Sequence, residues 1–136
     1  MHVEQIIRSH PHVKENTNDA LIRCIQECLE CASSCVACAD ACLGEQAVQQ
    51  LTQCIRLNLD CADVCAATGT VATRRTGSNE QTIRAMLRAC ADACRACGSE
   101  CERHASHHDH CRVCAEAFRR CEQSCNQMLQ QLTSAA

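Results

Sequence analysis

The stretch CIQECLECASSCVACADAC, residues 24–42, places its six cysteines at steps of 4, 3, 4, 3 and 4 residues. Residues three and four apart lie on the same face of an α-helix, so these thiols would form one stripe along a helix. Leucine and isoleucine normally occupy a core-facing stripe of this kind. The stretch therefore predicts a long helix whose buried face is made of thiols.

Three later segments repeat the pattern, and two of them have one non-cysteine residue in the stripe, Asn58 and Phe118. The single proline and four glycines leave long helices uninterrupted. These segments predict an all-α protein, an antiparallel four-helix bundle with a cysteine-lined core and a short N-terminal helix. The candidate metal ligands are all seventeen cysteines: Cys24, Cys28, Cys31, Cys35, Cys38, Cys42, Cys54, Cys61, Cys65, Cys90, Cys94, Cys97, Cys101, Cys111, Cys114, Cys121 and Cys125.

Capping and breaking residues set the expected bounds of the elements. Pro11 should end a short helix at about residues 3–9. The next helix should begin between residues 16 and 18 and end at Gly44. We expect the remaining helices at about 45–72, from Ser78 or Asn79 to 104, and at 109–132. The chain would then divide into a leader, residues 1–16, and a bundle, residues 17–136.

Composition and charge exclude several classes of function. The net charge is −3 and Phe118 is the only aromatic residue, which argues against a nucleic-acid partner. No apolar stretch near the N-terminus suits a signal peptide or a membrane span, so we expect a cytoplasmic protein with no membrane partner. Many cysteines are typical of a secreted disulfide scaffold, but the count is odd and the spacing is helical, and both features favour reduced thiols.

The first long helix also has a second apolar stripe beside the thiols. This stripe either packs against a neighbouring helix or forms a subunit interface. Its members are Ile25, Leu29, Ala32, Val36, Ala39 and Leu43.

The two ends of the expected bundle differ in chemistry. Four histidines gather at the end that holds Cys42, Cys101 and Cys111, and we expect metal uptake there. The thiol stripe that ends at Cys101, continued by steps of three and four residues, reaches His104 and then His108. His110 is a third candidate, whereas His107 is expected to be solvated.

The opposite end should be an apolar plug of Leu21, Thr68, Ile83, Leu87, Met128 and Leu132. We expect His2, His10 and His12 at the surface, although a leader that folds back could bring them to one end of the bundle.

Charge favours copper(I) as the bound metal. Four CxxC pairs and seven CxxxC pairs place sulfurs together on helix faces. A zinc site with four thiolates has a net charge of −2, and buried uncompensated charge is costly. Copper(I) takes few thiolates and shares them, so about one ion per thiolate leaves the core near neutral. Iron–sulfur clusters are usually held by loops rather than by uninterrupted helices.

These features resemble the bacterial copper storage proteins, which are cysteine-lined four-helix bundles. The resemblance extends from about Asn18 to Leu132, and the few methionines and missing export signal are similar to the cytosolic branch. It implies a homotetramer that folds without metal and stores many Cu(I) ions on all seventeen cysteines. It also implies metal uptake near His104, His108 and His110. A copper donor or acceptor protein is a further candidate partner. Where Asn58 and Phe118 replace thiols, the cluster arrangement would differ.

Other functions stay open at this point. The chain could be a zinc or general metal buffer, or a CxxC thiol-redox or iron–sulfur protein. A redox CxxC normally lies at an exposed helix N-terminus, whereas most of these pairs lie in the middle of a helix. We expect no enzyme, because the sequence has no Ser/His/Asp set, no paired catalytic carboxylates and no glycine-rich phosphate loop.

Overall fold

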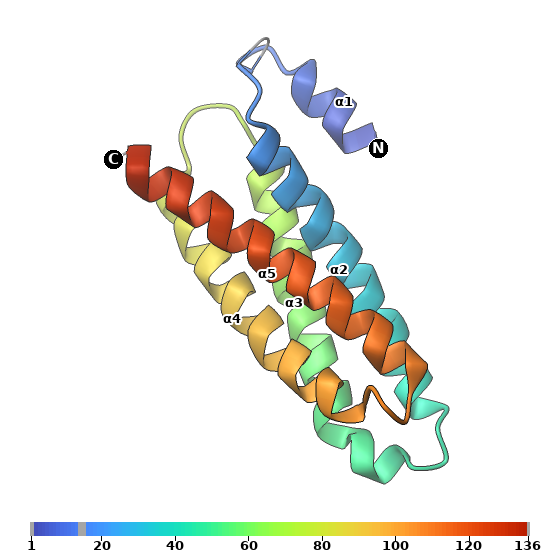
Figure 1. Cartoon of the computed structure of the whole chain (residues 1–136). Helices are drawn as coiled ribbons and strands as arrows, with labels where there is room; N and C mark the ends of the chain where they lie inside the picture. Colours follow the sequence, from blue (N-terminus) through green and yellow to red (C-terminus); the bar gives the residue numbers. More distant parts are fainter. Residues whose placement is uncertain (1, 14–15, 136) are drawn as a thin grey trace.

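The structure is a computed structural model that describes residues 2–13 and 16–135, with side chains up to residue 132. Helix α1 (His2–Arg8) precedes four long helices, α2 (Asp19–Leu43), α3 (Thr52–Thr73), α4 (Glu80–His104) and α5 (Asp109–Ala135). A 3-10 turn, η1 (Val48–Leu51), leads into α3. Figure 1 shows the long helices side by side in one elongated bundle, with α1 folded back beside the end where α2 begins.

Helix α2 begins and ends where capping residues predict. The Asn18 side chain accepts a hydrogen bond from the Leu21 N–H at 3.1 Å, which satisfies one free donor of the first turn. Gly44 follows the last residue, but its φ is −82°, so this helix ends without a left-handed glycine. The predicted start of α2 is therefore confirmed within one residue.

The predicted start of α3 at residue 45 is wrong, because the helix begins at Thr52. The chain reverses direction between α2 and α3, and residues 44–51 form a turn and η1 to span that reversal. Leu51 in η1 is buried and closes the end of the core. Local propensity favours helix throughout this segment, but the need to connect two antiparallel helices overrides it.

Residues 74–79 connect α3 to α4. Gly77 has a φ of +72°, a conformation that glycine adopts without strain. Asn79 occupies the cap position of α4, but its side chain donates to the Val71 carbonyl at 3.3 Å instead of capping the helix. The Asn79 side chain, which was expected to cap α4, therefore joins the start of α4 to the end of α3.

The four long helices pack as an antiparallel bundle. Helix α2 lies against α3 and α5, and α4 lies against α3 and α5, so each long helix has two neighbours. The buried residues form one continuous cluster along the bundle axis. No strand occurs in residues 2–13 and 16–135, and the predicted all-α bundle with a cysteine-lined interior is confirmed.

In the second apolar stripe of α2, some residues pack against a neighbouring helix and others are exposed, as a subunit interface would require. Ile25 and Ala39 are buried against neighbouring helices, whereas Val36 is 54% exposed and Leu43 is 61% exposed. Gly69 of α3 lets that helix approach Leu29 of α2 closely, because a Cβ there would lie 3.0 Å from Leu29 Cδ2.

Among the described helices, none has the length and apolar character needed to cross a bilayer.

Candidate metal centre

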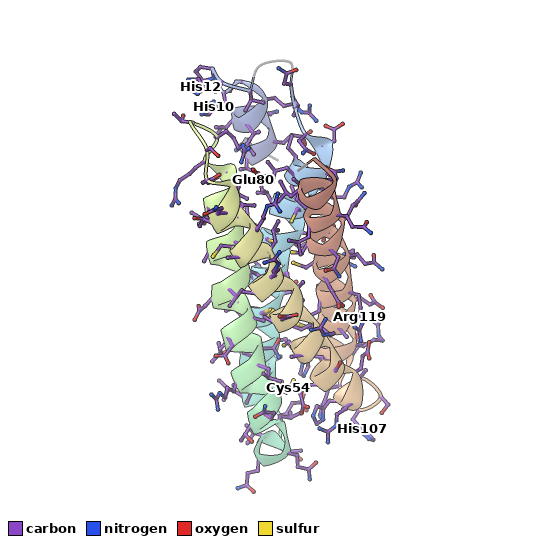
Figure 2. The ribbon with its side chains drawn as sticks, turned by 90° about the vertical axis from the view of Figure 1, so that its left-hand side faces the viewer. His10, His12, Cys54, Glu80, His107 and Arg119 are labelled. Atoms are coloured by element: carbon purple, nitrogen blue, oxygen red, sulfur yellow. The ribbon has the colours of Figure 1, made fainter. Side chains whose placement is uncertain are left out.

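All seventeen cysteines are free and buried, none more than 3% exposed. They come from α2, α3, α4 and α5, because the stripe of each helix faces the bundle axis. Figure 2 shows Cys54 toward the end of the bundle that holds His107. A thiol packs as a small apolar group, so the sulfurs fill the core that larger aliphatic side chains would otherwise fill.

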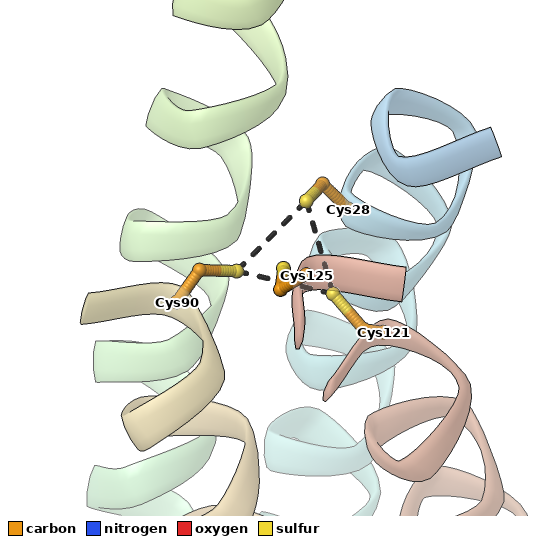
Figure 3. A group of neighbouring side chains, drawn as sticks. All are labelled: Cys28, Cys90, Cys121 and Cys125. Atoms are coloured by element: carbon orange, nitrogen blue, oxygen red, sulfur yellow. Dashed lines mark hydrogen bonds between the residues drawn. The ribbon is translucent and has the colours of Figure 1, made fainter. Parts of the chain in front are cut away.

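Four sulfurs from three helices converge near the α1 end of the core. Cys28 Sγ lies 3.8 Å from both Cys90 Sγ and Cys121 Sγ, and Cys90 Sγ lies 3.9 Å from Cys121 Sγ. Cys125 completes this group, and Figure 3 shows all four side chains pointing toward one another. The group could hold one ion among its four sulfurs.

A second group shares a member with the first. Cys121 also belongs to a set with Cys31, Cys65 and Cys94, whose sulfurs lie within 4.8 Å of one another. Cys65 Sγ lies 3.5 Å from Cys90 Sγ, which joins the two groups again. Because one sulfur serves two groups, the sites form a connected network suited to bridging thiolates.

Asn58 interrupts the network near its middle. Its side-chain Nδ2 donates to the Cys54 carbonyl at 2.8 Å, and its Oδ1 accepts from the Cys114 thiol at 3.3 Å. Nδ2 also lies 3.7 Å from Cys101 Sγ, and Cys54 Sγ lies 3.7 Å from Cys101 Sγ. These hydrogen bonds satisfy the buried Asn58 amide, whose dipole lies among three thiols.

Phe118 fills the other gap in the thiol stripes and is completely buried. Its backbone neighbour across the bundle is Gly98 of α4, where an added Cβ would lie 3.4 Å from Phe118 Cβ. The ring supplies apolar volume where α5 has no thiol.

At the other end of the core, a histidine joins the thiols. His110 Nδ1 lies 3.5 Å from Cys38 Sγ and 3.7 Å from Cys111 Sγ, and these residues form a group with Cys42. His110 Nε2 lies 3.3 Å from Glu45 Oε1. Since a carboxylate accepts the Nε2–H, the Nδ1 lone pair is directed at the sulfurs.

The remaining histidines of this end have other partners. His108 Nδ1 lies 3.2 Å from Glu45 Oε2, and the His108 ring stacks on His110 with centroids 5.6 Å apart. His104 Nε2 lies 3.2 Å from Glu100 Oε1. His107 is exposed at the tip of the α4–α5 connection (Figure 2). The structure thus places His110, the third candidate from the sequence, in contact with thiols.

Glu45 and Glu100 were not singled out from the sequence. The topology of the bundle could have indicated them, because the connection from α2 to α3 and that from α4 to α5 must lie at the same end of an antiparallel bundle. Glu45 directly follows Gly44, so it lies opposite the histidines. Carboxylates that orient metal-binding histidines are a common supporting feature of metal sites.

Burial favours the protonated form of Cys42 and Cys111 at the histidine end. It raises the pKa of Cys42 from 9.0 to about 11 and that of Cys111 from 9.0 to about 12. Metal binding at these residues therefore releases protons.

The donor set and its charge favour Cu(I) over Zn²⁺. Four sulfurs placed tetrahedrally at about 2.3 Å from one zinc ion would lie about 3.8 Å apart, so separation alone fits either metal. The buried polar side chains among the described residues are Asn58, Thr68 and Ser124, and none of them is charged. Only the bound metal can neutralise thiolates here, and one monovalent ion for each thiolate does so.

Comparison with known proteins agrees with this chemistry. A family model described as copper storage protein matches residues 17–130. The Streptomyces lividans copper storage protein Ccsp, solved with 10 copper equivalents, is 53% identical over 94% of this chain and 98% of its own, with a TM-score of 0.89. No curated protein sequence matches the chain.

Two further structures extend the comparison. A cytosolic copper storage protein from Streptomyces lividans, solved with five coppers, is 59% identical over 82% of this chain and 93% of its own, with a TM-score of 0.81. The apo form of copper storage protein 3 from Bacillus subtilis is 36% identical over 79% of this chain and 96% of its own, with a TM-score of 0.67. A continuous network of buried thiols, the bundle that holds it and these similarities lead to one conclusion: this chain belongs to the copper storage protein family.

Proposed function

We propose that this protein is a cytosolic store of copper, which binds many Cu(I) ions through the cysteine thiolates inside its bundle. The observation that supports this function most directly is the sharing of Cys121 and its neighbours between adjacent sulfur groups. Bridging thiolates let a small volume hold many monovalent soft ions. Relatives solved with five and ten coppers support the same role.

The proposed role is sequestration and not catalysis. Each uptake step is a ligand exchange, in which a thiol loses its proton and forms a bond to Cu(I) while the ion keeps its oxidation state. The ion would arrive from, or pass to, a donor or acceptor protein or a small thiol. All seventeen cysteines are proposed as ligands.

An anaerobic titration of the reduced protein with Cu(I), competed against a chromophoric Cu(I) chelator, tests this function. We expect tight uptake of more than about ten ions per chain, since roughly one ion per thiolate neutralises the core. A parallel titration with Zn²⁺ should give at most about four ions, because each takes four thiolates. Uptake of only one or two Cu(I) would contradict the proposal, and tighter binding of zinc would favour a zinc buffer.

Metal uptake is proposed at the end that holds His104, His108 and His110. The contacts of His110 with Cys38 and Cys111 make it the first candidate for receiving an ion. His108 and Glu45 hold the His110 ring in place. His104 lies on the same end but is bonded to Glu100, so its proposed role is to guide ions rather than to bind them in the core.

A homotetramer is proposed for the assembly. Its support is the exposed apolar face of α2 and α3, where Val36 and Leu59 are 54% and 47% exposed. A shallow surface groove lined by Ala32, Ala62 and Ala66 crosses the same face. Light scattering coupled to gel filtration should give four times the chain mass of 14.9 kDa. We expect Val36→Glu to reduce that mass, and a monomeric parent protein would contradict the tetramer.

A further inference from the structure

The end of the bundle opposite His110 contains a cavity of about 310 Å³. It lies between the leader and the plug of apolar side chains expected there, and its walls come from the leader, α2, α4, α5 and the α3–α4 connection. Figure 2 shows His10 and His12 above this end and Glu80 beside it. The sequence predicted an apolar plug at this end, and the structure adds a cavity beside it.

The floor of the cavity is one layer of side chains above the thiols. Leu21 and Met128 line it, and they lie three residues before Cys24 and three residues after Cys125. Three residues of helix, about 4.5 Å along the axis, separate each of them from its cysteine. Cys24 Sγ and Cys125 Sγ lie 3.9 Å apart and are the sulfurs next to this floor.

Two residues that can bind Cu(I) line the cavity. Met128 lines the floor, is 4% exposed and follows Cys125 by three residues of the same helix. His12 lines the cavity from the leader. Thioether sulfur and imidazole nitrogen are both ligands that Cu(I) accepts. The cavity therefore offers an ion a stepwise route between the thiol core and the leader.

The leader is attached to the bundle by weak contacts. Its ion pair Arg8–Asp19 spans 3.0 Å, but the two side chains are 45% and 77% exposed, and exposed ion pairs contribute little. His10 Nε2 lies 3.1 Å from Thr76 Oγ1. Ile7 is the one buried side chain of α1. Val3 and Val13 are only partly buried against the core. An element with one buried side chain opens at a lower free-energy cost than the bundle, and its opening exposes the cavity to solvent.

The wall presents both charges to a bound molecule. Arg75 and Glu80 line the cavity, with Glu80 also paired to Arg84 at 3.0 Å. These groups suit a small thiol that has both a carboxylate and an ammonium group. Ser78 and Asn79 add uncharged polar groups beside them.

We propose that this cavity is a second Cu(I) exchange site, at which a small zwitterionic thiol takes copper from the Cys24–Cys125 end of the core. Met128 is the relay ligand, and His12 stabilises the ion as it leaves. The incoming thiol forms a bond to Cu(I) and gives up its proton, the cysteine leaves the ion and takes up a proton, and copper stays Cu(I) throughout. This inference rests on the proposed storage function and adds a route that avoids the histidine end.

The first test uses the full chain labelled with ¹³C at the methionine methyl groups. The chain has three methionines, of which Met86 lies outside the cavity and Met128 lines it, and the variants Met86→Leu and Met128→Leu assign the signals of these two. We expect the Met128 methyl resonance to shift as Cu(I) fills the protein, while that of Met86 stays in place. A Met128 signal that keeps its metal-free position at every loading overturns the proposal.

The second test measures copper removal from loaded protein. Glutathione acts as the small thiol, and an excess of a bulky anionic Cu(I) chelator acts as the final trap. We expect Met128→Leu to slow the glutathione-dependent rate about tenfold, the lower end of what loss of a group next to a metal site costs. Met86→Leu is the matched control, and total copper released after unfolding should be the same in all three proteins.

The leader is tested in the same assay. His12→Ala should slow glutathione-dependent removal, whereas His2→Ala, which changes an exposed histidine of α1, should not. If Met128→Leu and His12→Ala both keep the parent rate, the cavity is not a copper route. Failure of storage itself would be distinct, because the protein would then take up no copper at the start.

Discussion

At the scale of single residues, the geometry at the histidine end depends on Glu45. One carboxylate accepts from His108 and His110, and it thereby fixes which nitrogen of His110 faces Cys38 and Cys111. Without that acceptor, the His110 ring could turn or carry its proton on the wrong nitrogen. Glu45 is thus a positioning residue and not a ligand.

Glu45→Ala should slow the binding of the first Cu(I) equivalents about tenfold and leave the final capacity unchanged, because supporting groups of metal-binding histidines have effects of this size. Stopped-flow mixing with less than one equivalent of Cu(I) measures the rate. Glu116→Ala removes an exposed carboxylate of α5 that pairs only with Arg112 among the described contacts, and it serves as the control. Equal rates for both variants and the parent would remove Glu45 from this role.

The sequence predicted which residues face the core and named three histidines at the uptake end, but it did not determine which of the three contacts thiols. Steps of three and four along α4 point to His104, yet the chain turns at residues 105–108 and breaks that register. Contact with Cys38 falls instead to His110, at the start of α5. Helical periodicity predicts positions within a helix and loses them across a turn.

At the scale of helices, two glycines distinguish close packing from ordinary packing. A Cβ at Gly69 would lie 3.0 Å from Leu29 Cδ2, whereas at Gly98 it would lie 3.4 Å from Phe118 Cβ. Gly98→Ala should stabilise the protein by about 0.5–1 kcal/mol, because alanine is the better helix former. Gly69→Val should destabilise it by about 1–3 kcal/mol, because the added methyl groups force α2 and α3 apart.

Denaturant unfolding of the reduced, metal-free protein measures both changes. A gain in the free energy of unfolding from Gly69→Val would mean that the contact between α2 and α3 is looser than the structure indicates.

The sequence predicted the existence and direction of every long helix, since the cysteine periodicity extends over most of each one. It missed the start of α3 by seven residues, because Glu45 to Leu51 have helical propensity but lie in a reversal of the chain.

At the scale of the whole molecule, a core of thiols makes stability depend on pH. The pKa values of Cys42 and Cys111 are raised to about 11 and about 12, so the folded protein holds these protons more tightly than the unfolded chain. Their contribution to stability is complete below about pH 9, the value for a free thiol, and is lost as the pH rises through 11 and 12. The melting temperature of the metal-free protein should therefore fall above pH 9.

Thermal unfolding under anaerobic, reducing conditions at pH 7 to 10.5 tests this dependence. Cys42→Ala removes one of these two thiols and should make the fall shallower, while Ser33→Ala, at an exposed position of the same helix, should not. A melting temperature that is constant or rises above pH 9 would contradict the pKa shifts.

The division into a leader and a bundle at residues 16 and 17 stays a prediction.

The complete burial of the cysteines also makes the chain a reporter of its own opening. A thiol-alkylating reagent adds a fixed mass at each cysteine that it reaches, and in the closed bundle it reaches none of the seventeen. If the bundle opens all at once, mass spectrometry should show two populations, unmodified and seventeen-fold modified, with few chains between them. If the ends fray separately, intermediate masses should appear, and peptide mapping should find the labels first at Cys42 and Cys111 or at Cys24 and Cys125. The order of labelling would then map cooperativity along the bundle in a protein that has no tryptophan or tyrosine to serve as an optical probe.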